Sequence, residues 1–259
     1  MTIEYMNNQE ITLLYDGSYE GLLTAIFVAF DTYKNAHITD ISPITGTQNT
    51  LFGDYINIET DETKFERVQN GILDKLGMEV LETVYEAYLS EMDKCGLYIL
   101  EYLQFAFQVG NQVNLHFAEE RVTRVLDLKR KVGFEIVRLA GFVRFKDIGY
   151  GVLYARICPT YNVVAMLMQF FIDRLPGQRV IIYDEKRNIY AVYDGDDFCL
   201  TDHIPFAANE MPDVNADYEA LWKVFFNSIA IEERKSRKRQ MALMPKKYWK
   251  NIVEKMGDA

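Results

Sequence analysis

The chain has 259 residues, of which 49% are hydrophobic and 25% charged, and its formal net charge at pH 7 is −10. These proportions are typical of a globular protein with a sizeable core, and they exclude a disordered or collagen-like chain. No uncharged apolar stretch approaches the about 18 residues that a membrane span needs, and no secretory signal is apparent at the N-terminus. We therefore expect a cytoplasmic protein with no membrane partner, and three scattered cysteines without a CxxC pair favour the same compartment.

The first strong pattern is an apolar run that ends at a turn and continues as an amphipathic segment. Residues 11–15 predict a buried strand, and residues 19–33 predict a helix after the turn Asp16-Gly17-Ser18. The turn has two interpretations: Asp16 or Ser18 caps the helix, or the N–H groups at the helix start hold a phosphate. Because no GxxxxGK[ST] or GxGxxG pattern accompanies it, capping is the favoured interpretation.

Residues 36–60 are polar and turn-rich, so they predict a loop with one short strand over 55–58. This segment is the best boundary between a small N-terminal lobe (1–60) and a main body (61–259). It contains no Pro/Gly/Ser-rich linker, however, and we expect one domain over 1–259. Helical patterns resume near residue 62 and predict helices over 63–75, 78–92, 95–109 and 118–140.

After Gly141 the pattern changes to strands that alternate with turns. Two hairpins are expected, each followed or preceded by helical sequence. The predicted strands are 142–145, 152–157, 180–183 and 189–193, and the predicted helices are 161–175, 215–232 and 245–256. This order predicts an α+β fold that is rich in helices and has one mostly antiparallel sheet.

Positive charge is concentrated in two windows of this acidic chain. Residues 121–146 and residues 232–250 each contain eight Lys or Arg and two acidic residues, a local net charge of +6, so the rest of the chain carries −22 (−10 − 12). If the windows meet in space, they form a positive groove that suits a phosphate backbone. The competing interpretation is that each basic helix face is solvated and paired with the abundant carboxylates.

Aromatic rings lie within the second window, at Tyr248 and Trp249. Cations with interleaved aromatic side chains suit nucleic acid with unstacked bases. Arg144, on the predicted strand 142–145, has two interpretations: a bidentate clamp for phosphate or carboxylate, or a member of a structural ion pair. We predict a nucleic-acid interface made of Arg121, Arg124, Lys131, Arg138, Arg144, Arg234, Arg237, Lys238, Arg239, Lys246, Lys247, Tyr248 and Trp249.

One short pattern resembles the layout of a metal-dependent nuclease. Asp184 and Lys186 follow a predicted strand, with Asp173 upstream, and such enzymes hold Mg²⁺ on two carboxylates beside a lysine. A turn between two strands explains the same residues, so these three are weak catalytic candidates. His37 and the other two histidines stand alone, and we predict no metal site and no cofactor.

Seven segments spread over most of the chain carry a resemblance to a known family. They are Tyr15–Ala25, Gly141–Phe145, Leu153–Ala155, Ile181–Arg187, Leu221–Phe226, Glu233–Gln240 and Met244–Trp249. Together they resemble an uncharacterised bacterial family of DNA metabolism proteins. Its members occur beside a radical-SAM DNA repair or modification protein, and a related form is fused to a uracil-DNA glycosylase-like domain. Two departures from the family pattern are Phe170, where a His commonly stands, and Ser236, where an Asn is usual.

The resemblance implies a process linked to DNA and a radical-SAM protein as partner. Together with the charge pattern it favours an accessory protein that binds DNA and positions it for a partner enzyme. Two alternatives remain open at this point: a divergent nuclease or base-processing enzyme centred on Asp184 and Lys186, and a protein-interaction module with a basic docking tail.

Overall fold

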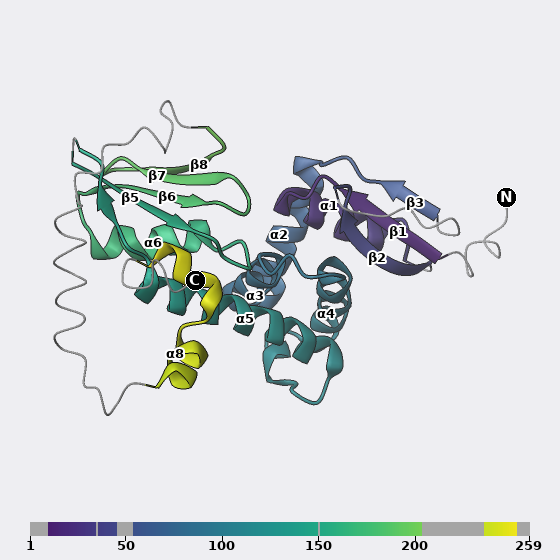
Figure 1. Ribbon diagram of the computed structural model, residues 1–259. Helices are drawn as coiled ribbons and strands as arrows, with labels where there is room; N and C mark the ends of the chain where they lie inside the picture. Colours follow the sequence, from purple (N-terminus) through teal and green to yellow (C-terminus); the bar gives the residue numbers. More distant parts are fainter. Residues whose placement is uncertain (1–9, 35, 46–53, 150, 204–235, 253–259) are drawn as a thin grey trace. The chain divides into compact units, whose positions relative to one another are not determined.

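The structure is a computed structural model that describes residues 10–34, 36–45, 54–149, 151–203 and 236–252 (Figure 1). The chain divides into two compact units, residues 1–133 and 134–259, and helix α5 (Glu120–Phe142) begins in the first and ends in the second. The described elements confirm the predicted α+β class. They form two sheets, however, so the expectation of a single sheet is wrong. None of the described helices has the length and apolar character needed to cross a membrane.

The sheet of the first unit has three parallel strands, β1 (Glu10–Tyr15), β2 (His37–Pro43) and β3 (Asp54–Asn57), in the order β2-β1-β3. The short strand predicted over 55–58 is confirmed by β3, but the prediction of a loop before it is wrong, because β2 lies there. The polar sequence of β2 conceals the strand, since Ile41 is its one buried residue and β2 pairs with a neighbour on one side alone.

Helix α1 (Tyr19–Asp31) follows β1 through a turn whose side chains hold each other. The Ser18 hydroxyl accepts the N–H of Gly21 at 2.9 Å and donates to Asp16 at 2.6 Å. Asp16 also accepts from the hydroxyl of Thr60 at 2.9 Å. Ser18 is thus the N-cap, and the carboxylate of Asp16 lies where an anion would have to bind, which confirms capping as the interpretation of this turn.

Helices α2 (Glu62–Leu76), α3 (Met78–Tyr88) and α4 (Cys95–Val109) complete the first unit and confirm three predicted helices. Their buried residues share one hydrophobic core with β1 and α1. Helix α4 approaches β2 so closely that a Cβ at Gly96 would lie 2.4 Å from the backbone oxygen of Ile41. Only glycine fits this contact, because backbone cannot move aside cheaply.

The sheet of the second unit has five strands in the order β4-β5-β6-β7-β8. Strands β5 (Val152–Ile157) and β6 (Arg179–Asp184) are parallel and joined by helix α6 (Val164–Arg174), while the other pairs are antiparallel. The hairpin of β6 and β7 (Ile189–Tyr193) confirms a prediction. The remaining strands, β4 (Lys146–Asp147) and β8 (Phe198–Thr201), are short and lie at the edges.

One predicted strand is absent from the described structure. Residues 142–145 are the last residue of α5 followed by irregular chain, although their aromatic and β-branched side chains favour a strand. Tertiary packing extends the helix, because the ring of Phe142 lies 5.8 Å from the ring of Tyr248. The first predicted hairpin is reduced to the two-residue pairing of β4 with β5.

The two faces of the second sheet differ. Helix α6 packs against β6 and β7, and on that side Ile182, Asp184 and Ala191 are buried. Neighbouring residues of a strand point to opposite faces, so Tyr183 and Tyr190 belong to the other face, where both are half-buried.

The C-terminal segment 236–252 consists of helix α8 (Arg237–Leu243) and the 3-10 helix η4 (Lys246–Asn251). The helix predicted over 245–256 is present in the described part as the 3-10 helix η4, which is tighter than an α-helix. The predicted helix 215–232 lies outside the described residues. In the second unit, η4 packs against β5.

Candidate nucleic-acid interface

Three predicted DNA contacts from the first basic window are paired with nearby carboxylates. In the first unit, Arg121 binds Glu119 at 2.7 Å, and Arg124 binds Glu120 at 2.5 Å. Lys131 binds Asp127 at 2.8 Å, one turn earlier on α5. Local ion pairs of this kind neutralise much of the window, as the competing interpretation expected.

The other two residues of this window lie in the second unit and differ from each other. Arg138 is exposed on α5 and has no ion pair within the described part of the chain. Arg144 follows α5 instead of lying on a strand, and its guanidinium donates to the backbone oxygens of Gly141 and Val143 at 3.0 and 3.3 Å. These bonds place the Arg144 side chain at the last turn of α5, and its predicted contact with DNA stays a prediction.

The second basic window is described in part. Arg234 lies outside the described residues, and so do the side chains of Arg237 and Arg239 on α8. Lys238 and Lys246 are exposed, and neither forms an ion pair with a described residue. The predicted DNA contacts of these five residues stay predictions.

The two aromatic residues of the second window are buried. Tyr248 is 4% exposed and Trp249 is 1% exposed, and the indole N–H of Trp249 donates to the backbone oxygen of Met244 at 2.9 Å. A base stacks on a ring face that solvent can reach, so the expectation that these rings stack on bases is wrong for the described conformation. They anchor η4 in the second unit instead.

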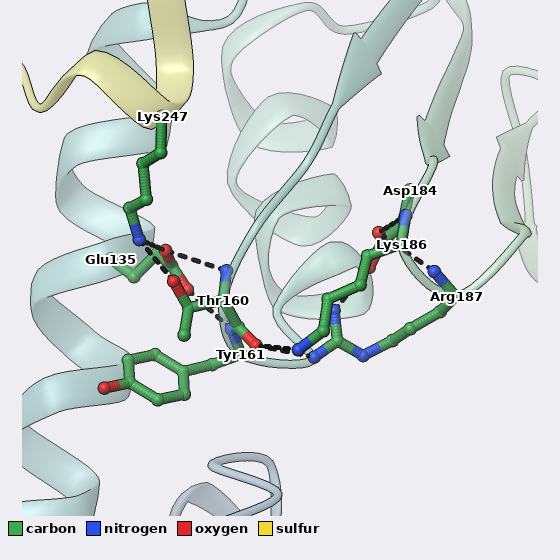
Figure 2. A network of polar contacts seen from close by, with 7 residues as sticks. All are labelled: Glu135, Thr160, Tyr161, Asp184, Lys186, Arg187 and Lys247. Carbon is green, nitrogen blue, oxygen red and sulfur yellow. Dashed lines mark hydrogen bonds and ion pairs between the residues drawn. The ribbon is translucent and has the colours of Figure 1, made fainter.

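Glu135 of α5 is the residue on which this anchoring converges. Its carboxylate is buried, with 2% of the residue exposed, and it accepts four hydrogen bonds. The phenol of Tyr248 donates to it at 2.6 Å. The ammonium of Lys247 also donates at 2.6 Å (Figure 2). The N–H groups of Thr160 and Tyr161 donate at 3.0 and 2.7 Å. Three separate elements, α5, η4 and the loop after β5, thus meet at one carboxylate.

The electrostatics of this contact follow from its donors. Burial by itself raises the pKa of the Glu135 carboxyl, but the bonds from Lys247, Tyr248 and the two N–H groups outweigh it and hold the pKa below its ordinary value. Burial, then the bond to Glu135, raises the pKa of the Tyr248 phenol. Glu135 is therefore ionised and Tyr248 neutral at pH 7, which makes the network a stable charge pair with Lys247.

Thr160 lies at the carboxyl ends of the parallel strands β5 and β6, and three cations donate to it. Lys186 and Arg187 reach its backbone oxygen at 2.5 and 2.9 Å, and Lys247 donates to its hydroxyl (Figure 2). Arg187 also pairs with Asp184 at 2.8 Å, and Asp184 is fully buried. Burial raises the pKa of the Asp184 carboxyl, and the guanidinium of Arg187 offsets only part of that effect.

Glu185 joins two further cations beside this point. Arg156 of β5 lies 3.2 Å from its carboxylate, and Lys250 of η4 pairs with its other oxygen. The bond to Glu185 raises the pKa of the Lys250 ammonium, which therefore stays protonated at pH 7. We call Arg156, Lys186, Arg187, Lys247 and Lys250 the cationic cluster.

The cationic cluster carries more charge than its carboxylates balance. Among the described residues, the five cations have three carboxylates as ion-pair partners, Glu135, Asp184 and Glu185, a difference of +2 (5 − 3). Lys186 is exposed and has a backbone oxygen instead of a carboxylate as its described partner. Ligands of α/β sheets commonly bind at the carboxyl ends of parallel strands, and an exposed excess of positive charge there suits an anion such as phosphate.

The nuclease candidates do not come together. Asp184 lies at the carboxyl end of β6, whereas Asp173 is exposed near the end of α6, just before the chain enters the opposite end of β6. Five residues of extended strand separate those ends by roughly 16 Å. Lys186 is directed to Thr160, and Asp184 is occupied by Arg187, so the predicted constellation is not formed.

Six residues of the site were not predicted from the sequence: Glu135, Arg156, Thr160, Glu185, Arg187 and Lys250. Glu135 had a detectable signal, because it stands at helical spacing between Val132 and Leu139, which are both buried. A carboxylate inside an apolar stripe of a helix needs a buried partner. Lys250 lies in the second basic window but was not singled out there, and the other four are placed by the pairing of β5 with β6.

Comparison with known proteins identifies one relationship. A family model described as a domain of unknown function, DUF4130, matches residues 93–254, more than half of the chain. The matched range contains Glu135 and all of the cationic cluster. No curated protein matches the chain.

Proposed function

The chain belongs to the DUF4130 family, a domain of unknown function, and from this premise we propose that it binds DNA through the cationic cluster of its second unit. The contact is with the phosphate backbone, which any DNA sequence presents. Phosphate contacts of lysine and arginine give affinity and orientation without base specificity. Binding of this kind suits an accessory protein that holds DNA for another enzyme.

The observation that carries the proposal is the convergence of Lys186, Arg187 and Lys247 on Thr160. These cations come from segments about 60 residues apart in the chain, and the fold brings them to one strand end. Like charges repel, so gathering them is unfavourable unless carboxylates or an anion balance them. Glu135 and Asp184 balance two of the three, and a phosphate would balance the third.

The free positive charge is centred on Lys186. Lys247 and Arg187 each have a carboxylate within 2.8 Å, whereas Lys186 is bound to an uncharged oxygen. On the other side of Glu185, Arg156 and Lys250 share one carboxylate, which leaves a second unit of charge. We place the phosphate contact between Lys186 and Lys250, with exposed Lys246 and Lys238 of the C-terminal segment as further contacts.

The role of the bound DNA follows from the sequence resemblance to DNA metabolism proteins. In this proposal the chain presents DNA to a partner enzyme, and a radical-SAM protein is the partner that the resemblance implies. No group of three His, Cys, Asp or Glu side chains among the described residues is arranged to hold a metal ion. In the proposal the partner enzyme carries out the reaction on DNA, and this chain binds the DNA.

The test is charge reversal at Lys186, measured by fluorescence anisotropy with labelled duplex and single-stranded DNA at low salt. We expect Lys186→Glu to weaken binding about tenfold and to flatten the dependence of affinity on salt. The side chain is exposed and its partner is a backbone oxygen, so the fold should tolerate the change.

The matched control is Lys34→Glu, the same change at an exposed lysine of the first unit. It should bind DNA within about twofold of the wild type, since it preserves the cationic cluster. Equal binding by Lys186→Glu and Lys34→Glu, or no binding by the wild-type chain at low salt, would refute the proposal.

A further inference from the structure

One row of side chains crosses the second sheet on the face opposite α6. In the strand register Arg156 of β5 stands across from Tyr183 of β6, and Tyr183 stands across from Tyr190 of β7. Thr201 of β8 continues the row. Residues directly across from each other in neighbouring strands point to the same face, so these four side chains lie side by side.

The two tyrosines of this row stack on each other, so each ring covers one face of its neighbour and the outer ring faces lie toward Arg156 and Thr201. Their ring centroids are 4.3 Å apart and the ring planes differ by 18°, which is a stacked arrangement. The hydroxyl of Tyr183 donates to the side-chain oxygen of Asn188 at 3.0 Å, which fixes that ring. Both residues are only half-buried, so part of the stack contacts solvent.

A cross-strand aromatic pair also stabilises a sheet. Two features distinguish this pair from a purely structural one. Arg156 lies next to Tyr183 in the row and belongs to the cationic cluster as well. Glu185, which Arg156 and Lys250 share, follows the end of β6 two residues after Tyr183.

The stacked tyrosines and the cationic cluster are therefore next to each other, joined by Arg156. From Arg156 to Tyr190 the row covers two strand spacings, roughly 10 Å, so a phosphate at Lys186 and Lys250 and a base on the tyrosines lie close together. Stacking on an aromatic ring is available to any unpaired base, whereas the bases of a duplex are stacked on each other. The charge complementarity thus selects nucleic acid as the occupant, and the aromatic pair selects a single strand.

We infer that Tyr183 and Tyr190 are a stacking platform for an unpaired base of single-stranded DNA whose phosphate is held by the cationic cluster. The inference rests on the proposed function and deepens it, since it names the form of DNA. Arg156 links the two parts, because its guanidinium can lie against a ring face or a base while it pairs with Glu185.

The experiment compares Tyr190→Leu with Tyr190→Phe on three labelled ligands: a single strand of about 12 nucleotides, the same length without bases, and the corresponding duplex. Leucine keeps an apolar side chain in the strand and removes the ring, while phenylalanine keeps the ring and removes the hydroxyl. We expect Tyr190→Leu to weaken binding of the single strand about tenfold and to leave the abasic strand and the duplex within about twofold. Tyr190→Phe should bind all three like the wild type.

Unchanged binding of the single strand by Tyr190→Leu overturns the platform, as does an equal loss for leucine and phenylalanine. Lys186→Glu, measured in parallel, separates the two proposals: if it weakens binding while Tyr190→Leu does not, the phosphate contact stands and the platform falls. If neither variant changes binding, both fail. Thermal unfolding shows whether Tyr190→Leu reduces the amount of folded protein. If it does, Tyr183→Leu is used for the same comparison.

Discussion

The two basic windows of this chain carry the same net charge in the sequence and have different surroundings in the fold. In the first unit, Arg121, Arg124 and Lys131 are paired with carboxylates two to four residues away on or beside the same helix. In the second unit, Lys247 and Lys250 meet partners more than 60 residues away, on α5 and at the end of β6.

The difference shows that a local count of charge does not predict surface potential. A cation with a carboxylate three or four residues away is largely neutralised by its own helix. A cation that reaches another element is placed by the tertiary structure, together with whatever other charges that element holds. The excess positive charge of the cationic cluster is placed by tertiary structure in this way. The same placement makes the cluster a candidate binding site. The predictions below test this contrast.

The largest expected effect is on stability, at Glu135→Gln. An amide has one acceptor oxygen and presents N–H groups to the donors of Lys247 and Tyr248, which then lack partners. We expect a loss of about 2–4 kcal/mol in the free energy of unfolding, measured by chemical denaturation. If Glu135→Gln lowers the free energy of unfolding by less than Arg124→Gln does, the difference described between the ion pairs of the two units is contradicted.

The next effect is on DNA binding, measured by neutralising two charges in each window. Lys186→Gln with Lys250→Gln should weaken binding about tenfold at low salt and reduce the slope of log affinity against log salt by nearly 2. Arg121→Gln with Arg124→Gln removes the same charge from the paired window and should change affinity by less than about threefold. If both double variants lose the same DNA affinity, the local ion pairs do not prevent Arg121 and Arg124 from contributing to DNA binding.

A third effect concerns pH. The pKa of Glu135 is lowered in the folded protein, so its ionised contacts stabilise the fold above the ordinary glutamate pKa, and this contribution is lost as pH falls through the lowered value. The difference in Tm between wild type and Glu135→Gln should therefore be constant near neutral pH and shrink under acid conditions. Asp184 has a raised pKa but is common to both proteins, so it cancels in the difference. A difference that grows as pH falls would contradict the assignment.

The smallest effect is expected at Arg124→Gln alone. Its guanidinium is 37% exposed and pairs with Glu101 and Glu120 near the surface, where ion pairs contribute about 0.2–1 kcal/mol. Thermal unfolding should show a shift that added salt removes, since salt screens such pairs. A shift that high salt leaves unchanged would indicate packing of the side chain against Tyr98 instead of the ion pairs.

Elements with strong local signals were predictable from the sequence. Helices α1 to α4 have clear apolar periodicity, and the turn Asp16-Gly17-Ser18 contains its own cap. The hairpin of β6 and β7 has two apolar runs around a polar turn. In each case the residues that stabilise the element are close neighbours in the chain, so a short window of sequence contains the cause.

Elements without such signals were missed or misassigned. Strand β2 has one buried residue, Ile41, and its partner β1 lies about 25 residues earlier. On α5 the apolar Val137 is exposed, whereas the charged Glu135 is buried and was not among the predicted site residues. Tyr248 and Trp249 looked like a stacking surface because cations surround them in sequence, yet both rings are buried.

The sequence by itself determined the α+β class, most helices and one hairpin, because periodicity and caps act over a few residues. It also determined how much positive charge each window holds. Only the tertiary structure decided which of that charge is neutralised, since Glu135, Asp184 and Glu185 reach their partners through strand pairing and the docking of η4. Coulomb interactions depend on distance in space, and a linear pattern contains that distance only for near neighbours.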